Sequence, residues 1–442
     1  MATDGSFKIG SNTVVFIDED HLDDETVKQI TAMDSHPSLE HIRVMPDCHK
    51  GRDCCIGLTA HVSDKIKPNF IGGDIGCGMT VYPIGELSSF IGKPGKREKR
   101  SERIDCRIKN AIVDRQIYIR DYKGDLDNSQ LDPYITADDL NQLYDDTNRD
   151  AETLVELYMN ATGIDISEYR PLYGPDYSFD LHIRTKYDFI KSIYTLGTIG
   201  NGNHFIEINE DSEGLGYISV HTGSRSLGKK ICEFHQRSIN EGRSWSSSND
   251  TGKSKNERHP DYLEGESLYL YLFDMLYAQN YAKLNRRVVI KTVLSLLNIN
   301  DIDESLFIES IHNYIDLESD GPIIMRKGAV KRGGQSVIAL NMRDGIAIVS
   351  AESNEDWNDS LPHGCGRIAM RSDNGNKKER MRRFKEQMDD ADVYTSSISW
   401  GTLDEAPDNY RDYQLVLSKL DSGCNIERIL RPVINIKADS MN

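Results

Sequence analysis

The segment "IGGDIGCGMT", residues 71 to 80, places one carboxylate, Asp74, and one thiol, Cys77, three residues apart among glycines. Glycine in this number costs backbone entropy, so we expect the chain to fold tightly around something here. Carboxylate and thiolate are both side-chain types that bind metal ions. The segment is therefore a candidate metal-binding loop.

Five histidines lie beside Gly, Asn or Asp and at the ends of strand-like runs: His49 in "MPDCHKG", His204 in "GNGNHFIEI", His221 in "VHTGSRSLG", His312 in "SIHNYID" and His363 in "LPHGCGR". A lone histidine is more often a packed or surface residue than a ligand. Together with Asp74 and Cys77, however, these imidazoles provide enough ligands for one or two transition metals. Ligand softness alone favours zinc and allows iron, cobalt or manganese.

Two further loops, "LGTIGNGNHF" and "HTGSRSLG", carry closely spaced backbone N–H groups, and Arg225 adds a planar cationic fork. This combination indicates phosphate binding, although each loop alone could be an ordinary turn. The "TGKSK" run is not a Walker A loop, because Ser247 stands where its first glycine is needed. The "MRDG" run has Met342 where a lysine-nucleophile ligase has lysine, so a nucleotide would have to be activated by another residue.

Composition predicts a cytoplasmic protein with reduced thiols. The chain has 442 residues and eight cysteines without a C-x-x-C pair, and no apolar run approaches the roughly 18 residues of a membrane span. The net charge of −18 counts against broad nucleic-acid binding. Basic runs at Lys93–Arg107 and Lys377–Lys385 are nevertheless able to contact phosphates, if they are not simply solvated faces.

Short β-branched runs at residues 217–222 and 305–315, and in "PIIMRKGAV", "SVIALNM" and "IAIVSA", predict strands. Apolar residues returning at three and four predict one long helix over Leu268–Leu297. Strands and helices do not alternate strictly, so we expect an α+β fold with mixed sheets and peripheral helices. Residues 240–267 and 371–390 are predicted to be exposed loops or helices. Because neither resembles a linker, we expect one domain over residues 1–442.

Eight segments resemble, in order, motifs of the RtcB family of RNA ligases: "PDCHKG", "GGDIGCGM", "GTIGNGNHFIEI", "VHTGSRSLG", "HNY", "RKGA", "PHGCGR" and "DEAPDNYRD". The resemblance covers about Met45 to Lys437, and "MLYAQNYAKLNRR" is similar to the family's long helix. Several linked motifs in order are far more specific than any one of them. The resemblance implies a single large catalytic domain.

The resemblance also implies a site with two Mn²⁺ ions and GTP. Cys77 would bridge both ions, Asp74 and His204 would complete one metal site, and His221 and His312 the other. His363 would take GMP from GTP, and Asp47 would orient its ring from the other nitrogen. Further roles follow by motif for the nucleotide and the RNA: Asn203 and Arg225 near the phosphates, Glu207, Tyr410 and Lys437 around guanine, Asn341 in the nucleotide pocket, and Arg367, Arg371 and Lys327 at phosphate or RNA.

The implied reaction joins an RNA 3′-phosphate or 2′,3′-cyclic phosphate to a 5′-hydroxyl through a histidine-GMP intermediate, in RNA repair or tRNA splicing. The expected partner is RNA, with room for an activator protein and no membrane, and the protein is expected to be a monomer or weak oligomer. Two alternatives stay open, a metal-dependent RNA-end phosphodiesterase and a non-catalytic RNA-binding scaffold. Gly73, Asn341, Cys365 and Met370 replace the family's usual Val, Ser, Ala and Ser and indicate a divergent paralogue.

Overall fold

The computed structural model describes residues 5–124, 131–240, 260–317, 321–368 and 376–439. Helices and mixed sheets combine as the sequence predicts, which confirms the α+β class. The division into domains stays a prediction. No helix within the described ranges is both long enough and apolar enough to cross a membrane.

Two large sheets form the middle of the molecule. The six-stranded sheet has the order β1 (Phe7–Ile9), β2 (Thr13–Val15), β3 (Glu40–His49), β4 (Ile56–Val62), β12 (Ile323–Lys327) and β11 (Asn313–Asp316). The seven-stranded sheet has the order β10 (Ile308–Ile311), β6 (Gly78–Glu86), β8 (Leu215–Thr222), β7 (Phe205–Glu210), β17 (Cys424–Ile436), β15 (Gly345–Ala351) and β14 (Gln335–Asn341). Short ribbons pair β13 (Ala329–Lys331) with β16 (Ser360–Pro362) and β5 (Lys65–Ile66) with β9 (Leu263–Glu264).

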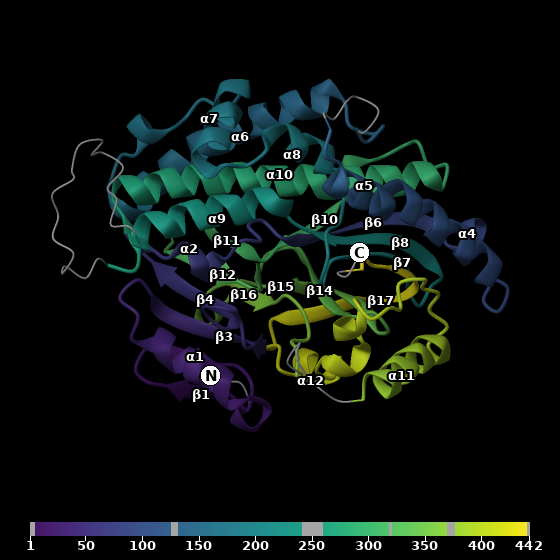
Figure 1. Ribbon diagram of the computed structural model, residues 1–442. Helices are drawn as coiled ribbons and strands as arrows, with labels where there is room; N and C mark the ends of the chain where they lie inside the picture. Colours follow the sequence, from purple (N-terminus) through teal and green to yellow (C-terminus); the bar gives the residue numbers. More distant parts are fainter. Residues whose placement is uncertain (1–4, 125–130, 241–259, 318–320, 369–375, 440–442) are drawn as a thin grey trace.

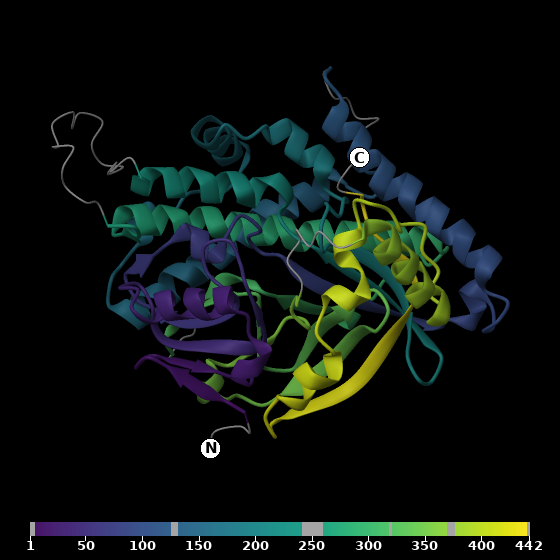
Figure 2. The same cartoon turned by 60° about the horizontal axis from the view of Figure 1, so that its bottom comes forward.

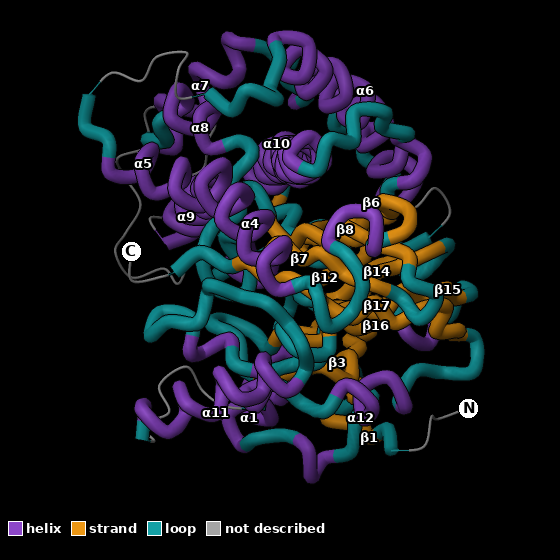
Figure 3. The backbone as a smooth tube through the Cα atoms, turned by 90° about the vertical axis from the view of Figure 1, so that its right-hand side faces the viewer, coloured by secondary structure: helices purple, strands orange, loops and turns teal. Residues whose placement is uncertain are grey.

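Helices cover the sheets from two sides. Figures 1 and 3 show one group above the strands: α4 (Glu98–Ile108), α5 (Arg115–Asp121), α6 (Ala137–Thr162), α7 (Pro175–Thr185), α8 (Phe189–Thr195), α9 (Arg225–Asn240) and α10 (Glu266–Leu296). On the opposite side lie α1 (Asp24–Asp34), α11 (Lys377–Asp390) and α12 (Tyr413–Ser418). The one-turn helices α2 (Pro68–Ile71) and α3 (Ser88–Ile91) adjoin strands. Figure 2 shows the long strand β17, in yellow, crossing the C-terminal half.

The predicted long helix is α10, within two residues of its expected limits. Apolar side chains surround it almost completely, and most of its residues are buried, as expected of a helix that runs through the core. The expected exposed segments are described only in part. Residues 376–390 contain the largely exposed helix α11, residues 260–267 contain β9 and the start of α10, and 241–259 and 371–375 lie outside the described residues.

In the seven-stranded sheet, successive side chains alternate between an apolar face and a polar face. Ile206, Ile218 and Ile434 belong to the apolar cluster that includes Val289 and Val293 of α10. Side chains one residue along a strand point to the other face, so Glu207 and Asn435 face away from α10. The same strands therefore bury an apolar face against the helix layer and direct polar side chains to the opposite face.

The single strand predicted over residues 305–315 is wrong in one respect. The chain breaks at His312, so that β10 pairs with β6 of the seven-stranded sheet and β11 pairs with β12 of the six-stranded sheet. A similar break at Gly328, which has a φ of 65°, separates β12 from β13. Local β propensity does not reveal such breaks, because the pairing partner of each half decides them. His312 thus lies where the two sheets meet.

Two polar side chains of α10 hold the loops that carry the candidate ligands. Arg286 is fully buried and donates to the carbonyls of Gly76 at 2.8 Å and Thr222 at 3.2 Å. Asn285 accepts from the N–H of Gly197 at 2.8 Å and donates to the carbonyl of Gly223 at 3.2 Å. Three loops far apart in sequence are therefore fixed to one helix turn.

We expect Arg286→Met to lower the free energy of unfolding by about 2–4 kcal/mol, because it leaves buried carbonyl oxygens without donors. Denaturant unfolding of the full chain measures this change. Arg287→Met is the matched control, since Arg287 is partly exposed and pairs with Glu304 at 2.9 Å, and its expected cost is about 1 kcal/mol or less. Equal losses of unfolding free energy in the two variants would contradict this role of Arg286.

Candidate active site

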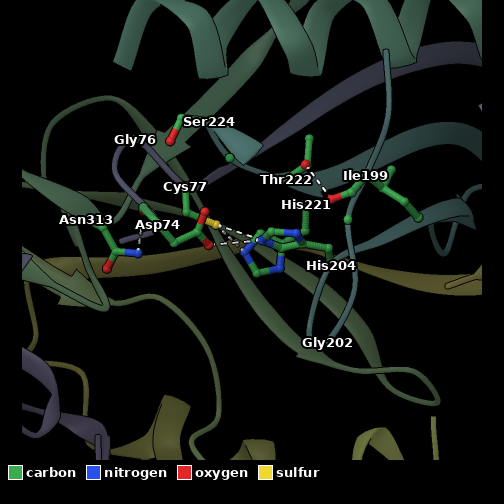
Figure 4. A network of polar contacts seen from close by, with 12 residues as sticks. Asp74, Gly76, Cys77, Ile199, Gly202, His204, His221, Thr222, Ser224 and Asn313 are labelled. Carbon is green, nitrogen blue, oxygen red and sulfur yellow. Dashed lines mark hydrogen bonds and ion pairs between the residues drawn. The ribbon is translucent and has the colours of Figure 1, made fainter. Parts of the chain in front are cut away.

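Four of the predicted ligands converge between strand ends and loops. The Cys77 Sγ lies 3.3 Å from the Nε2 of His204 and 3.3 Å from the Nε2 of His221. The His204 Nε2 is also 3.1 Å from Asp74 Oδ2. Figure 4 shows the Cys77 sulfur and the Asp74 carboxylate facing these two imidazoles.

His312 completes the cluster from the junction of the two sheets. Its Nε2 lies 3.4 Å from the Nε2 of His221. Two groups of side chains can each hold an ion, Asp74, Cys77 and His204 in one and Cys77, His221 and His312 in the other. Cys77 belongs to both groups, so the described residues provide two adjacent groups able to hold a metal ion, with one common thiol.

The glycines of the opening segment allow this convergence. Gly76 has a φ of 69°, and a Cβ there would lie 2.8 Å from the Cα of Gln279 on α10. A Cβ on Gly223 would lie 2.3 Å from Asp74 Oδ1. Both positions therefore need glycine, one for its backbone conformation and both for close approach. The loop is further fixed by Ser224, which donates to the Ile75 carbonyl at 2.6 Å.

Burial sets the protonation states of the cluster. It lowers the pKa of His221 and His312 well below the usual range, so both imidazoles are neutral, which is the form that binds metal. Burial and the neighbouring Asp74 raise the pKa of the Cys77 thiol. Burial alone would raise the pKa of Asp74 as well, but the charge of His204 and its hydrogen bond outweigh burial and lower it. The donor set of neutral imidazoles, one carboxylate and one thiol fits divalent transition metals.

His363 adjoins the cluster on the side of the six-stranded sheet. Its ring centroid lies 4.8 Å from that of His312, and its Nδ1 lies 2.7 Å from the Oδ2 of the fully buried Asp47. The same carboxylate oxygen accepts from the N–H of Gly364 at 3.1 Å. Asp47 therefore contacts one nitrogen of the ring and leaves Nε2 for other chemistry.

A cavity of about 1160 Å³ opens beside the cluster. Its lining includes Asp74, His221, His312 and His363. It also includes five residues expected at the nucleotide, Asn203, Glu207, Asn341, Tyr410 and Lys437, and two cations expected at phosphate or RNA, Lys327 and Arg367. His49 lines it too, with Nδ1 on the Asp47 carbonyl at 2.9 Å. Burial lowers the pKa of His49 to about 4.

Glu207 lies at a buried end of the cavity between two amides. Asn209 Nδ2 donates to its Oε2 at 2.7 Å, and Asn435 Nδ2 donates to its Oε1 at 2.7 Å. Burial raises the pKa of Glu207 to about 7, because the two amides and the charge of Lys437 offset only part of the cost of desolvation. Asn435 carried no expectation from the sequence, since an asparagine inside an apolar strand gives no motif.

Glu405 is a second residue that the sequence did not single out. It forms an ion pair with Arg367, accepts from the hydroxyl of Tyr410 at 2.7 Å, and lies 3.3 Å from Lys437 Nζ. Burial lowers the pKa of Lys437, and the charge of Glu405 counteracts that effect. Glu405 lies inside the "DEAPDNYRD" motif, so the sequence contained a signal that could have identified it.

Three predicted phosphate or nucleotide residues have defined partners, and a fourth lies outside the described residues. Arg225 donates to Thr198 Oγ1 at 3.0 Å. It is not among the described residues that line the cavity. Lys327 donates to the Ile71 carbonyl at 2.8 Å, and Asn341 donates to Asp344 at 2.7 Å within the β14–β15 turn. Arg371 lies outside the described ranges, as does Met370.

Two of the unusual residues are explained by packing. A Cβ at Gly73 would lie 3.1 Å from the Cα of Lys229, so α9 approaches the loop closely at this position. Cys365 is buried within the apolar cluster of Val330, Leu361 and Val416. Neither residue alters a side chain of the metal cluster.

The fold and site therefore define an α+β protein with a paired metal-capable centre beside a cavity of about 1160 Å³. The family model described as tRNA-splicing ligase RtcB matches residues 29–438. The chain belongs to the RtcB family.

Named relatives are distant but match over most of their length. RNA-splicing ligase RtcB1 of Escherichia coli (strain ATCC 25922) is 25% identical over 417 residues, which cover 90% of this chain and 90% of the relative. RNA-splicing ligase RtcB of E. coli K12 is 25% identical over 430 residues, with the same coverage of 90% each. The tRNA-splicing ligase RtcB of Methanococcus maripaludis is 23% identical over 478 residues, covering 93% and 92%.

The shared thiol predicts how metal binding responds to substitution. We expect isothermal titration with Mn²⁺ to give two ions for the wild type, one each for His204→Ala and His312→Ala, and none for Cys77→Ala, because only Cys77 belongs to both groups. His61→Ala, outside the cluster, is the control and should bind like the wild type. One remaining ion in Cys77→Ala would show that the two sites are independent.

The raised pKa of Glu207 predicts a pH-dependent stability. The folded protein holds this proton more tightly than the unfolded chain, so stability is lost as the pH rises toward about 7. Glu207→Gln removes the effect, and its stability relative to wild type should increase by about 2–3 kcal/mol between pH 5 and pH 8. Denaturant titrations at both pH values test this, with Glu213→Gln as an exposed control. A difference that does not change with pH would refute the assignment.

Proposed function

We propose that this protein is a cytoplasmic RNA ligase that joins an RNA 3′-phosphate or 2′,3′-cyclic phosphate to a 5′-hydroxyl through a histidine-GMP intermediate. Membership of the RtcB family over residues 29–438, and relatives named RNA-splicing or tRNA-splicing ligases, support the ligase class. The observation that carries the finer mechanism is the pairing of His363 with Asp47 at 2.7 Å beside the metal-capable cluster.

In the first step, His363 is the nucleophile. Asp47 fixes Nδ1, so Nε2 is the nitrogen that attacks the α-phosphorus of GTP. An N–P bond forms, the bond between the α- and β-phosphates breaks, and pyrophosphate leaves. The buried Asp47 carboxylate stabilises the positive charge that develops on the ring during attack.

The next two steps transfer GMP and seal the strand. An oxygen of the RNA 3′-phosphate attacks the GMP phosphorus, the N–P bond breaks, and His363 is regenerated. The RNA 5′-hydroxyl then attacks the activated 3′-phosphorus, loses its proton, and releases GMP. A 2′,3′-cyclic end must first be opened by water to the 3′-phosphate.

The remaining residues hold the reactants. Asp74, Cys77, His204, His221 and His312 would hold two Mn²⁺ ions. Such ions neutralise phosphate oxygens as charge develops on them. Glu207, Tyr410 and Lys437 would contact guanine, with Asn203 and Arg225 toward the phosphates and Asn341 at the edge of the nucleotide pocket. Arg367 and Lys327, two cations that line the cavity, would contact RNA phosphates.

The covalent step is directly testable. We expect protein incubated with α-labelled GTP and Mn²⁺ to carry the label on a denaturing gel, and His363→Ala to carry none. Asp47→Asn keeps the size of the side chain but removes its charge, so the rate of labelling should fall by about 100-fold or more.

His61→Ala is the matched control, because His61 lies on β4 away from the cavity lining. Labelling of His363→Ala at the wild-type rate would overturn the nucleophile assignment. Absence of label in the wild type, with GTP and Mn²⁺ bound, would favour the phosphodiesterase.

A further inference from the structure

A polar row crosses the seven-stranded sheet at the buried end of the cavity. Asn435 of β17 pairs in register with Glu207 of β7, which pairs with Ser219 of β8. Their exposed fractions are 0%, 1% and 0%. Polar side chains at such depth are costly unless they are hydrogen-bonded, so each polar atom of this row needs a partner.

The Glu207 carboxylate orients the two amides beside it. When Glu207 is ionised, above its pKa of about 7, its carboxylate only accepts hydrogen bonds, so Asn435 and Asn209 both present their NH₂ groups to it. The Oδ1 of Asn435 therefore acts as an acceptor, and it has no hydrogen-bond partner among the described residues. A buried acceptor without a donor is costly.

The nearest cation does not supply the missing donor. Lys437 Nζ donates to the carbonyls of Gly202 at 3.1 Å and His204 at 3.2 Å, and to Glu405 Oε2 at 3.3 Å. An ammonium group has three N–H donors, so these three acceptors use all of them.

The cavity distinguishes the two asparagines. Asn435 and Glu207 are among its lining residues, whereas Asn209 is absent from the described lining. Asn435, whose buried amide oxygen has no partner among the described residues, and Glu207 thus form a pair of acceptor side chains in the cavity lining. This pair matches a base edge with two adjacent N–H donors.

We infer that Asn435 is a specificity-determining residue of the nucleotide site, whose amide oxygen accepts a hydrogen bond from the N1–H or 2-amino group of guanine. The inference rests on the proposed use of GTP. Adenine has the acceptor N1 beside its single amino group and only C–H at position 2, which would leave Asn435 unpaired or facing a lone pair. Sites built to hydrogen-bond a donor discriminate strongly against analogues that lack it, because their own buried polar groups are left unpaired.

Nucleotide binding by the Mn²⁺-loaded full chain tests the inference. Dissociation constants for GTP and ATP are measured by equilibrium dialysis in a His363→Ala background, where no adduct can form, for the otherwise unchanged chain and with Asn435→Leu or Asn209→Leu added. Leucine keeps the size of asparagine, and each variant removes one amide from Glu207. We expect Asn435→Leu to reduce the preference for GTP over ATP by about tenfold or more. Asn209→Leu should keep most of it.

Three results would overturn the inference: equal affinity of the otherwise unchanged chain for GTP and ATP, an unchanged preference in Asn435→Leu, or equal reductions in both variants. The last would mean that Asn435 acts only by holding Glu207. If Asn435→Leu does not fold, as judged by thermal unfolding, Asn435→Ala replaces it. Covalent labelling in parallel reports on the proposed function separately, because GTP selectivity without an adduct would support Asn435 and count against the histidine mechanism.

Discussion

The site depends on the contact of one helix turn with three loops. Asn285 and Arg286, both fully buried on α10, bind backbone groups of residues 76, 197, 222 and 223. Within the described residues, each loop that carries a candidate metal ligand of the seven-stranded sheet is either in this set or adjacent to it. A buried guanidinium is costly to desolvate, and the carbonyls that compensate it are therefore held in fixed positions. The ligands gain their geometry from this requirement.

The same sheet separates two kinds of chemistry along one face. At one end, Cys77 and the neutral imidazoles of His221 and His312 form a centre suited to cations. Two residues further along these strands, where Glu207 pairs with Ser219, Glu207 and the amides beside it form a group suited to hydrogen-bond donors. His363 enters from the six-stranded side, where β16 ends, and its partner Asp47 belongs to β3 of that sheet.

Charge is organised locally although the chain is strongly acidic overall. Glu405 holds Arg367, Lys437 and the hydroxyl of Tyr410 around one carboxylate. Lys327 points its ammonium to the carbonyl end of α2. These cations line the cavity in an acidic molecule of net charge −18. Binding of a polyanion would thus be concentrated at the cavity, because the net negative charge of the chain repels phosphates elsewhere.

The sequence by itself determined the kinds of residue, the long helix and the family. Asp74, Cys77 and the four clustered histidines were recognisable because rare side chains recur in glycine-rich motifs, and α10 because an apolar 3.6-residue period is a local property. Only the tertiary structure decided the break at His312, the contacts that Glu405 makes with Arg367, Tyr410 and Lys437, and the polar row of Asn435, Glu207 and Ser219. Each depends on which distant strand or loop lies opposite, and the free energy of such pairings comes from burial and hydrogen bonds between residues far apart in the chain.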